Sequence, residues 1–288
     1  MRLVFVHGMR QERKNPVALK ATWDAALTGA WARLGLVPLA DYDSVMPYYG
    51  DKLEDLTQAA RGSASAVVAR GPGGPMEFTP LEQALIRSIA PKLGVTNAEI
   101  DARLGSEVVA RGPANWEWVQ AAARVLDDKV PVVGNLALGF VRQVDAYLTR
   151  SNIYDAVNDI VAPAFVDGPR VIVAHSLGTI VSYLVLRRIA ANPRVPLFVT
   201  LGSPLGIPTV KQYLKPPSLH KPNGVMDWLN GVDERDYVAL VSKLDEASFA
   251  GGIDNVCDIH NREEDAHSIE DYLANARVAK KIHEALTP

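Results

Sequence analysis

The sequence lacks most of the features that mark secreted, membrane-spanning and nucleic-acid-binding proteins. Its 288 residues include one cysteine, Cys257, which excludes an intrachain disulfide and lies in an apolar run typical of a small core residue. No apolar run approaches the ~18 residues of a membrane-spanning helix, and the run at residues 3–6 is too short for a signal peptide. The formal net charge is −3, without a long Lys/Arg run to follow phosphates. These absences favour a cytoplasmic protein with no nucleic-acid partner and no stable membrane insertion.

The composition is that of an ordinary globular protein. Hydrophobic residues make up 48% of the chain and charged residues 22%, so a chain of this length can bury a sizeable core without metals or disulfides. No internal repeat is visible. The sequence therefore predicts one large domain, or one domain that carries a large insertion.

Two segments of the chain alternate strand-like and helix-like patterns. Asn15 can cap the first free N–H groups of a helix, Pro16 suits its first turn, and Gly35 suits its end. Pro47 weakens the second strand. The alternation predicts an α/β fold, a mostly parallel sheet of about six strands covered by helices on both faces. We expect strands within residues 3–6, 43–49, 171–174, 197–201, 225–229 and 255–259, and helices within 15–34, 53–60, 177–190, 269–276 and 278–286.

The middle of the chain has a different character. Residues 62–79 are rich in Gly, Ser, Ala and Pro, which predicts a loop or linker, and residues 80 to about 165 have a helical pattern. Breaks are expected near Gly94, Gly112 and Pro131. We therefore divide the chain into a core of residues 1–61 and 167–288 and a helical insertion of residues 62–166. Such an insertion is a candidate lid or wall of a substrate pocket, and the alternative is a subdomain that only completes the core.

The strongest chemical signal is the run Ala-His-Ser-Leu-Gly at residues 174–178. It lies between an apolar strand and an amphipathic helix, where a sharp turn exposes Ser176 and aims the helix N-terminus at a developing negative charge. The small residues Ala174 and Gly178 allow the strand and helix to pass close by. A serine nucleophile needs a base, an acid that orients the base, and donors for the oxyanion. The alternative is a surface serine at a tight turn.

This run and three other segments resemble the α/β-hydrolase superfamily, and most closely its lipase and esterase branch. The resemblance covers residues 1–60 and 168–288, and Ala174 departs from the glycine usual there. It implies an oxyanion hole made by the backbone N–H groups of Met9 and Leu177. The supporting segments are Phe-Val-His-Gly-Met at 5–9, Thr-Leu-Gly-Ser-Pro-Leu-Gly at 200–206, and Trp-Leu-Asn at 228–230 with Asp-Tyr-Val-Ala at 236–239.

The family order is serine, acid, histidine. Among the carboxylates after Ser176, Asp236 matches the family's acid-bearing turn best, Asp233 is the second choice, and either could instead cap a helix. For the base, His267 lies between the last strand and the closing helices, and His260, at the end of that strand, is the second choice. The other histidines are expected elsewhere: His7 in the oxyanion turn, His175 pointing away from the base, His220 before the acid and His283 in the last helix. No spacing suits a closed zinc site, so no metal or cofactor is expected.

A charged loop, Arg-Gln-Glu-Arg-Lys at residues 10–14, follows the oxyanion turn. Its composition favours a solvated loop, and contact with an anionic part of a substrate is the alternative.

These residues lead to the hypothesis of a serine esterase. Ser176 would attack the acyl carbon of a small-molecule or lipid-like ester, His267 would move the proton, and Asp236 would orient His267. Because a fold does not determine the acyl donor, amide, thioester or lactone cleavage on the same triad is the first alternative. A non-catalytic binding protein with the hydrolase fold is the second.

Overall fold

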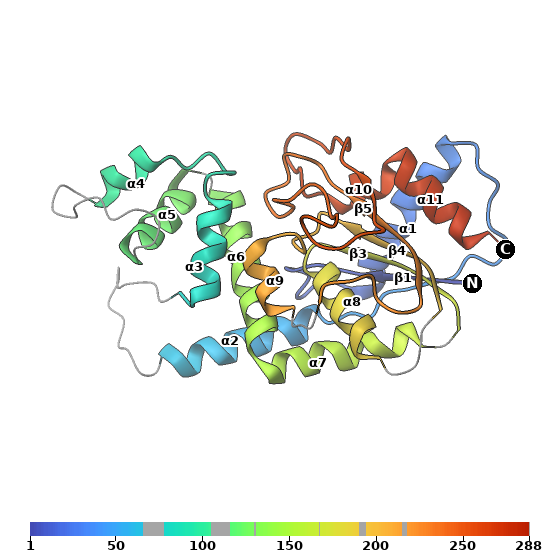
Figure 1. Cartoon of the computed structure of the whole chain (residues 1–288), viewed down its shortest axis with the longest axis horizontal. Coiled ribbons are helices and arrows are strands. Elements are labelled where there is room, and N and C mark those ends of the chain that lie inside the picture. Colours follow the sequence, from blue (N-terminus) through green and yellow to red (C-terminus); the bar gives the residue numbers. More distant parts are fainter. Residues whose placement is uncertain are drawn as a thin grey trace.

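A six-stranded parallel sheet, with helices on both faces, forms the centre of the molecule (Figure 1). The computed structural model describes residues 1–65, 78–104, 116–129, 131–166, 168–189, 194–214 and 218–287. The order of the strands is β2-β1-β3-β4-β5-β6, which confirms the predicted α/β class. This sheet is compatible with the α/β-hydrolase fold without being specific to it. The strands are β1 (Arg2–Val6), β2 (Ser44–Val45), β3 (Arg170–His175), β4 (Val195–Leu201), β5 (Val225–Gly231) and β6 (Asp254–Val256).

Helices supply the rest of the regular structure. The helices before residue 50 and after residue 166 are α1 (Pro16–Arg33), α8 (Leu177–Arg188), α9 (Pro208–Tyr213), α10 (Ile269–Ala274) and α11 (Ala276–Leu286). Asn15 caps α1 as predicted, because its side chain accepts hydrogen bonds from the N–H groups of Val17 and Ala18. The middle of the chain forms α2 (Gly50–Ser65), α3 (Pro80–Ile89), α4 (Asn97–Leu104), α5 (Trp116–Lys129), α6 (Pro131–Thr149), α7 (Ser151–Val161) and the short 3₁₀ helix η1 (Ala162–Phe165).

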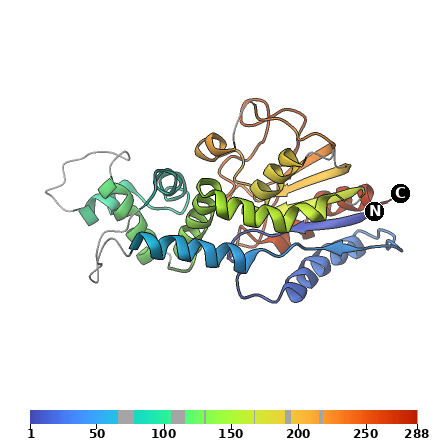
Figure 2. The same cartoon turned by 90° about the horizontal axis from the view of Figure 1, so that it is seen from below.

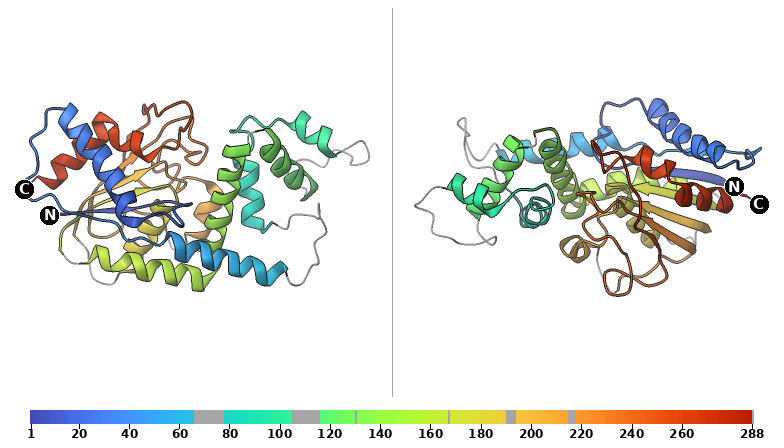
Figure 3. Two further views of the ribbon diagram at one scale, coloured as in Figure 1. Left: turned by 180° about the vertical axis from the view of Figure 1, so that it is seen from behind. Right: turned by 90° about the horizontal axis from the view of Figure 1, so that it is seen from above.

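Successive residues of the central strands point alternately into two hydrophobic cores, one on each face of the sheet. Strands β1 and β3 pair in register from Arg2 with Arg170 to Val6 with Ala174. Apolar residues at every position of such strands are expected when helices cover both faces of a parallel sheet. On one face, α1, α10 and α11 cover Leu3 and Phe5 (Figure 3), and the indole of Trp31 donates to the carbonyl of Ala279 at 2.9 Å.

The other face of the sheet is shared with the insertion. Val4 and Val6 belong to one continuous hydrophobic core that also includes residues of α8, α7, α6 and α3. Helices α2 and α7 lie side by side, and α7 packs against α8 (Figure 2). Helices α3, α4 and α5 lie at the end of the molecule far from both termini. The insertion therefore completes the core at its base and extends away from the sheet at its tip.

Several element boundaries differ from the sequence-based predictions. β2 has only two residues and ends before Pro47, which cannot donate to the ladder. β6 ends at Val256, three residues earlier than expected. Helix α2 continues through Ser65, so the linker predicted at residues 62–79 is helical in its first four residues. Its residues 66–77, and the break predicted at Gly112, lie outside the described residues. Gly94, with φ +76°, and Pro131, the first residue of α6, mark breaks as predicted.

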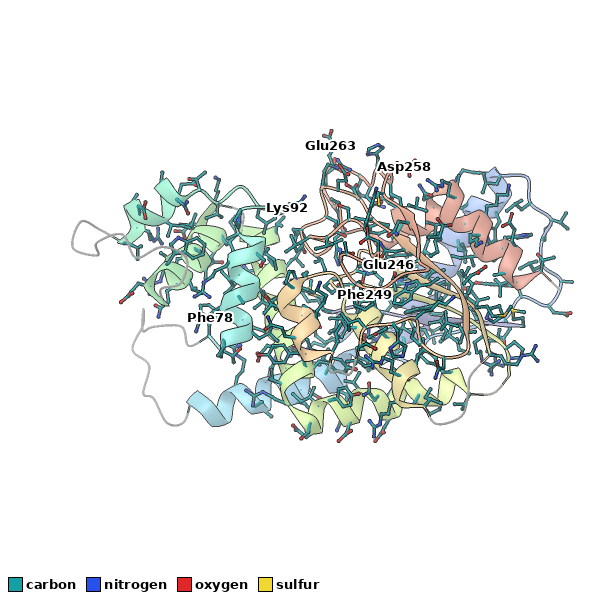
Figure 4. All side chains as sticks on the ribbon, viewed as in Figure 1. Phe78, Lys92, Glu246, Phe249, Asp258 and Glu263 are labelled. Carbon is teal, nitrogen blue, oxygen red and sulfur yellow. The ribbon has the colours of Figure 1, made fainter. Side chains whose placement is uncertain are left out.

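Long loops lie at the carboxyl ends of β5 and β6. The loop after β5 packs Phe249 against Tyr183 of α8 and Trp228 of β5, with ring centroids 5.2 and 5.8 Å apart (Figure 4). Lys92, which follows α3, donates to the carbonyl of Glu234 and so ties the insertion to this loop. The sequence predicts Cys257 to be a core residue, but the structure leaves it only half-buried. Its thiol donates to the carbonyl of Ser242 at 3.3 Å. Along the described chain, no helix is both long and apolar enough to cross a bilayer.

His7 anchors the end of β1 to the start of α2. Its Nδ1–H donates to the carbonyl of Gly8 at 2.8 Å, and its Nε2 accepts from the N–H of Tyr49 at 3.1 Å. The two rings stack with centroids 4.0 Å apart. Both nitrogens are used by the neutral imidazole, and burial lowers the pKa of His7 to about 4.

The depressed pKa of His7 predicts a loss of stability in mild acid. In the unfolded protein the His7 imidazole is protonated below about pH 6.5, whereas in the folded protein it is protonated only below about pH 4. The contribution of His7 is therefore complete above pH 6.5 and falls as the pH drops from 6.5 to about 4, by roughly 3 kcal/mol. We expect urea unfolding of His7→Asn to show a weaker dependence on pH across this window. The matched control is His260→Asn at an exposed position, and an equal weakening in the control would contradict this explanation.

The close approach of α8 to β1 depends on Gly178. A Cβ at this position would lie 2.3 Å from the carbonyl oxygen of Val6 and 2.4 Å from that of His7. Backbone atoms cannot move aside without shifting the strand. Gly29, in the middle of α1, has no such neighbour, since its nearest contact would be the Arg33 side chain at 3.5 Å.

We expect Gly178→Ala to lower the free energy of unfolding by ~1–3 kcal/mol through overpacking. Gly29→Ala should raise it by roughly 0.5–1 kcal/mol, because alanine restricts the unfolded chain and suits a helix interior. Thermal and urea unfolding of the two variants would measure both effects. A Gly178→Ala protein as stable as the parent would refute the close packing.

Candidate active site

Ser176 occupies the sharp turn between β3 and α8. Its φ of 56° and ψ of −131° place it in a region that non-glycine residues rarely adopt. Along the described chain, Arg10 and Arg13 are the other non-glycine residues with positive φ. The N–H of Ser176 donates to the carbonyl of Leu201 at 3.0 Å, and the side chain is almost completely buried. Strain of this kind is typical of turns that present a reactive group.

The end of β1 lies directly against this turn. A Cβ on Gly8 would lie 2.6 Å from the Ser176 Cβ and 3.1 Å from its Oγ, so only glycine allows this approach. Met9 follows and lines the same cavity as Ser176. Leu177 is the first residue of α8, so its N–H has no acceptor within the helix. The chain order reverses between β1 and β3, and ligands of open α/β sheets bind at such a switch point, outside the carboxyl ends of the strands.

Asp236 and His267 form a buried pair beside this turn. His267 Nδ1 lies 2.7 Å from Asp236 Oδ2, and the same oxygen accepts a hydrogen bond from the Tyr272 hydroxyl at 2.8 Å. The other carboxylate oxygen accepts from the N–H of Val238 at 2.8 Å. A Cβ on Gly202, where φ is +54°, would lie 2.7 Å from Asp236 Oδ2. Three donors and a close-fitting glycine therefore hold the carboxylate in place.

The second-choice residues lie in different surroundings. Asp233 pairs with the guanidinium of Arg235 at 2.7 Å and accepts from the N–H of Asn261 at 2.7 Å. Burial tends to raise the pKa of Asp233, but these hydrogen bonds outweigh it and lower the pKa overall. His260 is exposed at the surface. The structure thus pairs His267 with Asp236, whereas the Asp233 carboxylate pairs with Arg235 and His260 lies at the surface.

His175 contradicts one expectation from the sequence. Its side chain does not point away from the base, because its Nε2 lies 3.0 Å from the carbonyl oxygen of His267 and the two rings are 4.4 Å apart. A carbonyl can only accept, so Nε2 of His175 carries the proton. Burial first, and the neighbouring His267 second, lower the pKa of His175 well below the usual value. His175 is a neutral donor that fastens the His267 loop to the turn.

One cavity of about 700 Å³ contains both Ser176 and His267. Within the described residues, neither Ser176 Oγ nor His267 Nε2 has a hydrogen-bond partner, although both atoms are buried. These two groups therefore remain available to a bound molecule, and a catalytic hydrogen bond between them often tightens only when substrate is bound. Further walls come from different parts of the chain, among them Trp23 of α1, Leu136 of α6, Tyr237 and Ile269.

Tyr272 and Tyr237 were not identified from the sequence. Tyr272 accepts from the N–H of Asp233 at 3.0 Å while it donates to Asp236, so its hydroxyl joins the two carboxylate residues. Burial raises the pKa of Tyr272 well above its usual value, which keeps the hydroxyl protonated. Tyr237 packs its ring against His267, with centroids 5.7 Å apart. In the sequence both residues resemble ordinary aromatic core positions, and only their distance from Asp236 distinguishes them.

The groups that the structure places at this site are side chains and backbone N–H groups. No cluster of three or more His, Cys, Asp or Glu side chains in the described parts of the chain could hold a metal ion. A serine hydroxyl, a carboxylate-oriented imidazole and backbone N–H donors could together perform acyl transfer. No known protein-family model matches this chain, and no curated protein matches its sequence significantly. The argument for function therefore depends on the geometry of the site.

Proposed function

We propose that the protein is a serine hydrolase that cleaves a carboxylic ester through an acyl-enzyme intermediate. The observation that carries the proposal is the buried Asp236–His267 pair at 2.7 Å, in the same cavity as a strained Ser176. A carboxylate on Nδ1 selects the tautomer whose Nε2 can accept a proton, which is the role of the acid in such triads. Structural ion pairs are common, but here the free nitrogen of the imidazole lies in a cavity with an unpartnered serine hydroxyl.

In the proposed reaction, Ser176 Oγ attacks the acyl carbon and His267 Nε2 takes the hydroxyl proton. The N–H groups of Met9 and Leu177 stabilise the negative oxygen of the tetrahedral intermediate, helped by the N-terminus of α8. His267 then gives its proton to the departing alcohol as the ester C–O bond breaks. Water attacks the acyl-enzyme by the same route, releases the acid and restores Ser176.

The insertion contributes to substrate choice in this proposal. Leu136 of α6 lines the cavity beside Tyr237, and α6 belongs to the same core as the sheet. A pocket wall of this kind sets the size of the acyl or alcohol group without taking part in the chemistry. Lid movement is not required, since the wall and the sheet share one core.

The first test replaces the nucleophile. Ser176→Ala should reduce turnover of short 4-nitrophenyl esters by at least ~10³-fold while the protein remains folded, because the covalent step is lost. A fluorophosphonate probe should label the parent protein at Ser176 and leave the variant unlabelled. Unchanged turnover in Ser176→Ala would refute the proposal. A folded parent protein that neither turns over esters nor reacts with the probe would favour the non-catalytic alternative.

The second test separates the two carboxylates. Asp236→Asn should reduce kcat by roughly 10²–10⁴-fold, since the amide no longer selects the required tautomer of His267. Asp233→Asn is the matched control, because Asp233 holds Arg235 and Asn261 and does not contact His267. We expect it to lower stability and retain most of the turnover. A larger loss of kcat in Asp233→Asn than in Asp236→Asn would overturn the assignment of the acid.

A further inference from the structure

The loop at residues 10–14 is a fixed part of the cavity wall, not the freely solvated loop that its composition favours. The N–H of Arg10 donates to Gln143 Oε1 at 3.2 Å, and the N–H of Arg13 donates to Asp51 at 2.6 Å. The Tyr48 hydroxyl donates to the carbonyl of Gln11 at 2.5 Å. A Cβ on Gly50 would lie 2.8 Å from the backbone of Gln11. Helices α2 and α6 thus hold the loop from two sides.

This anchoring places the Arg10 side chain over α6 and beside the site. A Cβ on Gly139 would lie 3.2 Å from Arg10 Cδ and 3.6 Å from one guanidinium nitrogen, so glycine makes room for the side chain. The positive charge of Arg10 is close enough to Tyr237 to oppose the rise that burial causes in the pKa of that phenol. Tyr237 in turn contacts His267. Arg10 therefore lines the same cavity as Ser176.

The charge of Arg10 is not neutralised by the protein. The half-buried Arg10 side chain makes no ion pair with a carboxylate among the described residues. Lys14, which is exposed and also lines the cavity, makes none there either. Two acidic residues line the same cavity. Asp265 accepts from the N–H of His267 at 3.1 Å, and Glu270 pairs with Arg262 at 3.3 Å. Arg10 and Lys14 therefore give the cavity positive charges that pair with no carboxylate among the described residues.

We propose that Arg10, supported by Lys14, binds a carboxylate carried by the substrate, so that the enzyme prefers esters with an anionic group. A guanidinium is planar and presents paired donors that match a carboxylate. Because Arg10 is partly buried, water screens such a contact less than it would at a fully exposed residue. This inference rests on the proposed ester hydrolysis and names its substrate class.

The test compares matched esters that differ in charge. For the acyl side, 4-nitrophenyl hemiadipate and 4-nitrophenyl hexanoate have equal chain length, and for the alcohol side 4-acetoxybenzoate is compared with 4-tolyl acetate. We expect the parent protein to favour the anionic ester in one pair, by roughly 10-fold or more in kcat/KM. Arg10→Gln should reduce this ratio by about 10-fold, and Arg10→Lys should restore part of it. The pair that responds identifies which part of the ester meets Arg10.

Arg13→Gln is the matched control. Arg13 belongs to the same loop and also has a positive φ, but its side chain is exposed and does not line the cavity. The ratio in this variant should equal that of the parent protein. An equal ratio for the parent and Arg10→Gln in both pairs, or an equal loss in Arg13→Gln, would overturn the proposal.

A binding measurement separates this inference from the proposed catalysis. Calorimetric titration of monomethyl adipate, an intact ester with a carboxylate, into Ser176→Ala measures the contact without turnover. Adding Arg10→Gln to that variant should weaken binding by about 10-fold, whereas binding of methyl hexanoate should not depend on the charge at position 10. If no ester is turned over, this titration decides alone, because equal binding of monomethyl adipate to both proteins would refute the carboxylate site.

Discussion

The close approach of β1, β3 and α8 is the constraint on which the rest of the site depends. Gly178 lets α8 lie against the carbonyls of Val6 and His7, and Gly8 lets the end of β1 touch Ser176. A side chain at either position would separate the serine from the backbone N–H groups that follow β1. The strained φ of Ser176 is stabilised by this packing and by the strands on both sides. Precise placement of a nucleophile thus comes from small residues in the layer beneath it.

The second requirement is a buried polar network that satisfies the Asp236 carboxylate with hydrogen bonds. An unpaired buried carboxylate is costly, and Asp236 avoids this cost through His267, Tyr272 and the N–H of Val238. His175 adds a hydrogen bond to the backbone of His267. These contacts come from segments after β3, β5 and β6, so the network joins the loops at one edge of the sheet. Ser176 Oγ and His267 Nε2 are buried there without a hydrogen-bond partner, and the proposed reaction uses both atoms.

In the proposed function, helix α6 and the loop at residues 10–14 shape what enters this site. Helix α6 supplies Leu136 as a wall and Gly139 as the space for Arg10, and its Gln143 holds the backbone of Arg10. Helix α6, which is distant in sequence from the turn at Ser176, therefore forms part of the cavity wall and leaves the space that the Arg10 side chain occupies. In this view the catalytic groups and the selectivity belong to different parts of the chain that share one core.

The sequence by itself determined the class of the fold and the turn at Ser176. Continuous apolar strands, a capped helix at Asn15 and small residues around the serine are local signals, and local signals can be interpreted from the chain alone. The resemblance to α/β-hydrolases also ranked Asp236 above Asp233 and His267 above His260, and the structure pairs the two residues ranked first.

Only the tertiary structure decided which groups surround that pair. The roles of Tyr272 and His175, the anchoring of the loop at residues 10–14 and the pairing of Asp233 with Arg235 depend on contacts between segments far apart in sequence. The direction of a side chain such as His175 follows from the packing of the sheet against the loops above it. The periodicity and spacing of the sequence do not predict such side-chain directions. These directions are determined only when the carboxyl ends of β1, β3, β4 and β5 meet at one edge of the sheet.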